Sequence, residues 1–340
     1  MTGALDEARV VDLARRLKGA ETGGWSASAV RALAEGIGRG TDGAAAPRVR
    51  TVERHEEDYV HGGEECIGLY VPVALPEGGA AEKAAAFRDA AEILTKEFGP
   101  ASIMGVYGDP GPFYRGTPLW GSPFLRWRGR EDTLELYPGE GGPELLLQPT
   151  GPVENWFWRQ GHGEPHAVGG FFGSRRVAAN AGLGFPGRWR TDDWNVFGRA
   201  LDDFLTTLPA ETTALGVELD LGIHALVPGT YGPVVFHLGC GERLEVAYDP
   251  DGLDATDPAS LGWIAGTTRP AALDHWIEAP YHSGDFGIGE VDGAALSRLI
   301  VDTLRGLGVA SPKGLSLSDH AQRVGDYHVE FYGLTLGENP

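Results

Sequence analysis

The chain has 340 residues, of which 48 are acidic and 28 are basic, so its formal net charge at pH 7 is −20. A hydrophobic share of 42% argues against an intrinsically disordered protein, and a chain of this length favours two domains over one. The 52 glycines and 23 prolines predict many turns around short elements. Two cysteines, Cys66 and Cys240, lie too far apart in sequence to indicate a disulfide framework.

The N-terminal residues predict an amphipathic helix rather than a secretory signal, because their apolar side chains recur at helical spacing among charges. No run of about 18 apolar residues occurs, so we expect no membrane span and a cytoplasmic protein. The acidic balance also argues against nucleic-acid binding, which needs lysine and arginine to neutralise phosphates.

Periodicity and turn residues predict the elements of the first half in chain order. Helices are expected over Asp6–Gly19, Ser26–Ile37 and Ala80–Phe98, and strands over Glu65–Val73 and Ala101–Tyr107. The third helix has the clearest end, because Gly99 and Pro100 follow it directly.

The densest pattern lies in Pro123–Gln160, where apolar and polar residues alternate between clusters of glycine and proline. Arg126, for example, stands between Leu125 and Trp127. Period-two runs separated by such clusters are typical of antiparallel strands joined by tight turns. The pattern predicts a three-stranded meander with one buried face.

The second half repeats this order of helix and strands. A helix is expected from Thr191 to Pro209 and another over Ala294–Leu307. Strands are expected over Thr213–Leu219, Pro233–Leu238, Arg243–Tyr248, Leu315–Leu317 and Tyr327–Leu336. The parallel between the halves suggests a degenerate duplication, although no aligned residues establish one.

These elements predict an α+β protein of two domains, each with helices packed on a mainly antiparallel sheet. The first domain is expected over residues 1–160, an aromatic and arginine-rich connection over 161–190, and an acidic domain over 191–340. Residues 115–190 hold 9 basic and 7 acidic residues, whereas residues 191–340 hold 7 basic and 23 acidic ones, a net charge of −16.

One loop has the residue types of a metal site. His162, Glu164 and His166 lie within five residues of one another, and imidazole and carboxylate groups suit zinc or another divalent ion. Glycine and Pro165 prevent the helix that would align such ligands, so an exposed polar loop is the competing interpretation and we expect no bound metal or other cofactor.

Two other groups could take part in binding a partner. The first is an acidic run consisting of Asp249, Asp251, Asp254 and Asp257, which lacks the final glutamate of a calcium loop. The second is Trp156 and Trp158, in a segment rich in arginine, where aromatic anchors of an interface are common. A solvated turn and a seal between domains, respectively, are the structural alternatives.

No motif in the sequence specifies a reaction. The residues His275, His282, Ser283 and Asp285 are close in sequence, but no G-x-S-x-G elbow accompanies them, and no phosphate-binding glycine loop is present.

Two stretches, LELYPGEGGPELLLQPTGPVENWFWRQ at residues 134–160 and GDYHVEFYGLTLGE at 325–338, resemble segments of uncharacterised bacterial proteins of the polymorphic-toxin immunity type. The resemblance covers about a fifth of the chain and implies no functional residues. It implies a small cytoplasmic protein that neutralises a toxin.

The acidic C-terminal region and this resemblance together lead us to expect a protein-binding function, that of an immunity protein against a basic toxin in interbacterial competition. Two alternatives remain at this point. One is a metal-dependent hydrolase that uses the histidine loop, and the other is a structural or scaffold protein with no small ligand.

Overall fold

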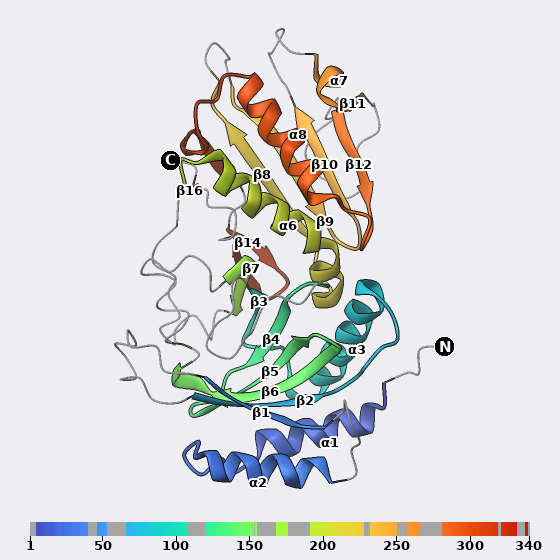
Figure 1. Cartoon of the computed structure of the whole chain (residues 1–340), viewed down its shortest axis with the longest axis vertical. Helices are drawn as coiled ribbons and strands as arrows, with labels where there is room; N and C mark the ends of the chain where they lie inside the picture. Colours follow the sequence, from blue (N-terminus) through green and yellow to red (C-terminus); the bar gives the residue numbers. More distant parts are fainter. Residues whose placement is uncertain are drawn as a thin grey trace. The chain divides into compact units, whose positions relative to one another are not determined.

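The structure is a computed structural model, and it describes residues 5–39, 46–52, 66–107, 120–152, 154, 168–175, 191–227, 232–249, 257–265, 281–318, 321–331 and 337–338. It is an α+β protein whose sheets are mainly antiparallel. The chain divides into two compact units, Met1–Gly187 and Arg188–Pro340 (Figure 1). Within the described residues, no helix is both long enough and apolar enough to cross a membrane.

The first unit contains helices and one sheet. The helices are α1 (Glu7–Lys18), α2 (Ala27–Gly38) and α3 (Ala80–Phe98). The strands are β1 (Arg48–Val52), β2 (Cys66–Pro72), β3 (Ile103–Tyr107), β4 (Pro123–Trp127), β5 (Asp132–Gly139), β6 (Gly142–Pro149) and β7 (Val168–Arg175). In the first unit they lie in the order β1-β2-β6-β5-β4-β3-β7, and neighbouring strands are antiparallel.

The predicted meander is present as β4, β5 and β6, and α3 has the predicted bounds. Helices α1 and α3 pack on one face of this meander, which is lined by leucine and tryptophan side chains. Trp127 marks this face, because its Nε1 donates to the Gly99 carbonyl at the end of α3 and its ring lies 6.3 Å from that of Phe98. Burial of these apolar side chains is the main stabilising contribution to such a layer.

The expectation of a single buried face was wrong. Every residue of β4 is buried, and so are all residues of β6 and all but the first of β5. The residues that alternate with the leucines include Arg126 and Glu135, which lie opposite each other in the register of β4 and β5. Alternation located the two faces correctly, but it does not report whether a polar face is in contact with water.

The second unit also has a sheet with helices on one side. Its helices are α6 (Trp194–Leu215), α7 (Pro258–Leu261), α8 (Gly293–Gly306) and the 3-10 turn η2 (Pro312–Gly314). Its strands are β8 (Leu219–Ala225), β9 (Val234–Cys240), β10 (Leu244–Asp249), β11 (Ile264–Ala265), β12 (Tyr281–Phe286), β13 (Leu315–Ser318), β14 (Ala321–Val324), β15 (Tyr327–Phe331) and β16 (Gly337–Glu338). The sheet order is β11-β12-β10-β9-β8-β13-β16, and β14 and β15 form a hairpin.

Helix α6 corrects the predicted helix end at Pro209 and the predicted strand over Thr213–Leu219. The helix continues through Pro209 to Leu215 and ends at Gly216 in the left-handed conformation, with φ 63°. Residues 208–212 are buried on all sides, and the Thr212 hydroxyl donates to the Gly241 carbonyl at 2.5 Å. Tertiary packing thus offsets the helix-breaking tendency of proline, and β8 begins only at Leu219.

The two units share a topology. In the first, α3 is followed by the meander β3-β4-β5-β6, and β7 then pairs antiparallel with the free edge of β3. In the second, α6 precedes strands in the order β8-β9-β10-β12, and β13 then pairs antiparallel with the free edge of β8. This shared order of helix, four-stranded meander and returning strand supports the suggested duplication at the level of topology.

Candidate functional site

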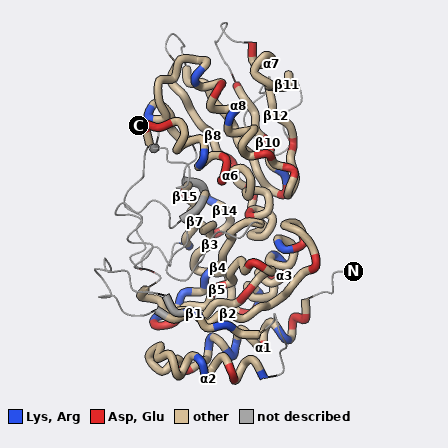
Figure 2. Tube along the Cα trace, viewed as in Figure 1, with Lys and Arg blue, Asp and Glu red and all other residues tan. Residues whose placement is uncertain are grey.

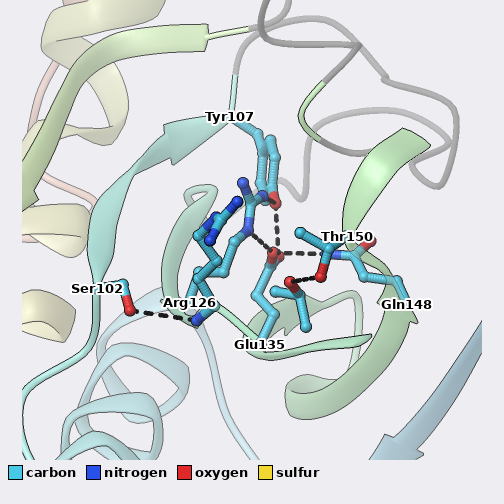
Figure 3. Close-up of polar contacts among 8 residues, drawn as sticks. Ser102, Tyr107, Arg126, Glu135, Gln148 and Thr150 are labelled. Atoms are coloured by element: carbon cyan, nitrogen blue, oxygen red, sulfur yellow. Dashed lines mark hydrogen bonds and ion pairs between the residues drawn. The ribbon is translucent and has the colours of Figure 1, made fainter. Parts of the chain in front are cut away.

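A buried polar network occupies the face of the first sheet that lies opposite α1 and α3 (Figure 3). Glu135 on β5 is at its centre and accepts three hydrogen bonds. The Tyr107 hydroxyl donates to Oε1 at 2.6 Å, Arg126 Nε donates to Oε2 at 2.9 Å, and Gln148 Nε2 donates to Oε2 at 2.9 Å. Arg126 Nη2 in turn donates to the Tyr107 oxygen at 2.7 Å. These contacts join β3, β4, β5 and β6 through side chains as well as through backbone bonds.

The network is buried, because the Arg126 side chain is 2% exposed and that of Glu135 is 0% exposed. A second pair of hydroxyls, Thr133 and Thr150, lies beside it with their oxygens 2.7 Å apart. In a medium of low polarity such charges attract each other strongly, but transferring them from water costs a comparable amount of free energy. A buried pair of this kind therefore adds little net stability relative to an apolar pair of similar volume, whereas loss of one partner leaves an uncompensated buried charge.

The described contacts of this network join neighbouring strands to one another. The carboxylate is fully hydrogen-bonded and the guanidinium stacks on the Phe124 ring, 5.0 Å from its centroid. Nearby, burial raises the pKa of Tyr137 well above its ordinary value. A phenol with a raised pKa is a weaker acid than an ordinary tyrosine and stays neutral at physiological pH.

The second sheet has a different polar surface, which we call the polar face. It is the face opposite α6 and α8, and its charged and titratable side chains alternate with the apolar core residues of four strands. They are Asp220 and His224 on β8, His237 on β9, Glu245 and Asp249 on β10, and His282 and Asp285 on β12. The register confirms their common side, because His237 pairs with Ala247, Ala247 with His282, and Glu245 with Asp285.

Among the described residues, helices α6 and α8 pack on the other side of this sheet. Thr212 of α6 contacts Cys240, and Trp263 contacts both Phe236 of β9 and Thr303 of α8. Side chains of the polar face are half-buried or exposed, whereas the network of the first sheet is buried. The polar face is therefore the more accessible of the two surfaces.

The cysteine of this sheet is not part of a reactive site. Cys240 is a buried free thiol, and burial raises its pKa to about 12. A thiol with such a pKa is protonated at neutral pH and therefore a weak nucleophile.

Only two of the predicted site residues lie in the described part of the chain. Asp249 ends β10 on the polar face, and Asp257 caps α7, where its Oδ1 accepts a hydrogen bond from Ala259 N at 3.1 Å. The other predicted residues lie outside the described residues; they are Asp251, Asp254, Trp156, Trp158, His162, Glu164 and His166. The described residues contain no group of three or more histidine, cysteine, aspartate or glutamate side chains arranged to hold a metal.

The loop containing His282 and Asp285 belongs to β12, where Asp285 pairs with Arg243 rather than with a histidine. Arg243 Nε lies 2.6 Å from the Asp285 carboxylate, and its Nη2 lies 2.9 Å from that of Glu290. Their proximity in sequence indicated only a possible nucleophilic group, whereas the sheet places His282 and Asp285 on one face with His224 and His237. Alternation within the strands would have revealed this, once their partners in the sheet were known.

No protein-family model, curated protein or solved structure gives a significant match to the chain.

Proposed function

We propose that the protein binds a basic protein partner, and that it acts as an immunity protein that neutralises a cationic toxin. The observation that carries this proposal is the concentration of negative charge in residues 191–340, which include 23 acidic residues and only 7 basic ones. Acidic residues predominate along the second unit in Figure 2. A potential of one sign accelerates encounter with an oppositely charged partner.

The second unit neutralises little of this charge internally. Among its described residues, Lys313 forms an ion pair with Asp192, and Arg243 forms ion pairs with Asp285 and Glu290. Seven basic residues cannot balance 23 acidic ones, so residues 191–340 keep a formal net charge of −16. An acidic surface also favours solubility, but solubility needs a smaller excess of charge than this.

The resemblance of residues 134–160 and 325–338 to proteins of the immunity type supports the same proposal. An immunity protein acts by binding alone, and it needs no catalytic group of its own. Tight neutralisation requires a low dissociation rate, which comes from apolar anchors, together with rapid association, which comes from charge.

Co-expression with the products of neighbouring genes tests the proposal. We expect one neighbour to encode a basic protein that arrests growth alone, is tolerated together with this chain, and co-purifies with it. The association rate of that complex should fall steeply between 0.01 and 0.15 M salt, because the Debye length shrinks from about 30 Å to about 8 Å. If no basic neighbour binds, or if its toxicity is unaffected by this chain, the proposal is wrong.

The acidic run offers a variant for the same complex. Replacing Asp249, Asp251, Asp254 and Asp257 with Asn removes four charges, and asparagine preserves the cap that Asp257 provides to α7. We expect a slower association with a flatter salt dependence and an unchanged circular dichroism spectrum. An unchanged association rate at low salt would show that this run does not steer the partner.

A further inference from the structure

We propose that strand β1, at the edge of the first sheet, accepts an extended segment of a partner protein as an additional strand, and that this segment carries carboxylate side chains at alternate positions. Backbone hydrogen bonds provide the affinity of such strand addition, and side chains at alternate positions provide the specificity. Because this edge lies in the first unit and is basic, the proposal is independent of the function proposed above for the acidic second unit.

The backbone of β1 offers a regular edge. The strand pairs with β2 at all five of its positions, from Arg48 with Tyr70 to Val52 with Cys66, and the register is unbroken. Within the described residues, no strand lies on its other side. Every second residue of an edge strand directs its N–H and C=O groups away from the neighbouring strand. The β1 edge therefore presents about two or three such residues to a further strand.

The other sheet has shorter edges. Its edge strands among the described residues, β11 and β16, have two residues each. Very short edge strands and bulges are devices by which proteins prevent unwanted pairing. Strand β1 has five residues and no bulge, so it is long enough to pair with another strand.

Two arginines give the β1 edge a charge. Arg48 and Arg50 lie on the same face of the strand, because they are two residues apart. Arg48 donates hydrogen bonds to the carboxylate of Glu144, whose side chain is 2% exposed. Arg50 is half-buried and stacks on the Tyr70 ring, 5.0 Å from its centroid, and no carboxylate among the described residues pairs with it. The edge therefore keeps one positive charge that the described residues do not neutralise.

This charge distinguishes between occupants. A second copy of β1 would bring its own arginines next to Arg48 and Arg50, and like charges across a pair of strands destabilise it. A strand with alternate carboxylates would place one of them beside Arg50, at a Cβ–Cβ distance of about 4.5–5.5 Å. Its other residues would lie beside the half-buried Val49, on the face where α2 contacts β1 and β2. We therefore expect apolar residues between the carboxylates.

The probe is a capped heptapeptide that alternates glutamate and valine, and it is compared with its Lys–Val counterpart at pH 7.5 and 0.15 M salt. A Debye length of about 8 Å limits repulsion between the Glu–Val peptide and the net charge of −20. The readout is hydrogen exchange of the β1 amides, which excludes binding of the Lys–Val peptide to the acidic second unit. We expect the Glu–Val peptide to slow exchange at alternate amides of β1, with an affinity roughly tenfold higher than that of the Lys–Val peptide.

No protection of β1 by the Glu–Val peptide, or equal protection by both peptides, would overturn the proposal. Either result would leave the proposed function intact, because that function rests on the charge of residues 191–340.

Replacing Arg50 tests the charge of the edge. We expect Arg50→Gln to raise the dissociation constant of the Glu–Val peptide about three- to fivefold, as for loss of one partly exposed ion pair. Arg50→Glu should invert the preference in favour of the Lys–Val peptide. The control is Arg9→Gln on α1, which removes the same charge from an exposed residue outside β1 and should change the dissociation constant less than about twofold. Equal effects of Arg9→Gln and Arg50→Gln would show that net charge, not the β1 edge, recognises the peptide.

The backbone contacts are tested without altering the protein. Two versions of the Glu–Val peptide are N-methylated, one at its glutamates and the other at its valines. In an extended peptide the amides of one class all point to the same edge, so pairing with β1 uses one class alone. We expect one version to lose affinity roughly tenfold and the other to lose much less. Equal losses would show that the peptide is not added as a strand, and self-association of the unmodified protein that Arg50→Gln alters would identify a second copy as the occupant and overturn the choice of partner.

Discussion

Replacing Glu135 with glutamine tests the account of the buried network most directly. Glutamine has nearly the same shape as glutamate, so the main change is loss of the negative charge that faces the Arg126 guanidinium. Both side chains are excluded from water, and Arg126 Nε lies 2.9 Å from the carboxylate. Removing one partner of a buried ion pair typically costs about 3–5 kcal/mol of stability, because the remaining charge stays in a medium of low polarity.

The double variant Arg126→Met/Glu135→Leu separates this cost from other effects. It removes both charges and keeps the apolar volume, and such replacements are often close to neutral. Here the Tyr107 hydroxyl and the Gln148 amide lose an acceptor, which costs roughly 1–3 kcal/mol for each buried group. We still expect the double variant to be more stable than the sum of its single variants predicts, by at least about 2 kcal/mol.

Hydrogen exchange of the backbone amides in β4, β5 and β6 is the suitable assay. It reports the free energy of opening within the first unit, whereas a single denaturation midpoint would mix the two units. The control is Glu97→Gln, which breaks the pair with Arg15, an ion pair whose Nε–Oε1 distance is 2.7 Å but whose Arg15 side chain is 64% exposed. Water screens that pair, so its loss should matter much less. If Glu135→Gln costs no more than Glu97→Gln, or if the single variants add, the network is not coupled as described.

Three further predictions concern the second unit. Burial, together with Asp249 and Tyr281, raises the pKa of Tyr248 to about 12. The neutral Tyr248 phenol therefore contributes fully to the free energy of unfolding below the ordinary pKa of about 10, and this contribution is lost as the pH rises toward 12. Denaturation should show this loss, and Tyr248→Phe should reduce it. Cys240 should resist labelling by a thiol reagent at pH 8 until the protein unfolds, measured in a Cys66→Ser background; rapid native labelling would contradict its burial. Gly293→Ala should lower the free energy of unfolding by about 1–3 kcal/mol, because the new Cβ would lie 2.5 Å from the Asp202 carbonyl oxygen. The control is Gly306→Ala on the same helix, where a Cβ meets no atom within 4 Å and should stabilise the protein slightly in thermal unfolding.

Much of the fold could be predicted where local signals agree with packing. Helix α3 was predicted with its bounds because its apolar spacing, the glycines before it and Gly99 after it all indicate the same element. The meander was predicted from alternation because its turns contain glycine and proline. In α6, by contrast, Pro209 indicates an end that the buried surroundings of the helix override. Propensity is local, and it cannot report contacts made by residues far away in sequence.

The candidate surfaces were harder to predict for the same reason. An arginine among apolar residues, such as Arg126, normally indicates a solvent-facing position, and its burial depends on Tyr107, Glu135 and Gln148 from three other strands. The acidic run could be recognised because its residues are neighbours in sequence. The polar face could not be recognised from the sequence, because the register of the sheet is what brings His224, His237 and His282 together.

The meander of the first unit also bears on how the chain folds during synthesis. Its strands β3 to β6 are neighbours both in sequence and in the sheet, so they can pair once residue 149 has left the ribosome. Roughly 190 residues follow it in the chain, and at about 5–20 residues per second their synthesis takes some 10–40 s. Local pairing of strands is much faster than that. We therefore expect Arg126 to pair with Glu135 before most of the 23 acidic residues of the second half have been synthesised.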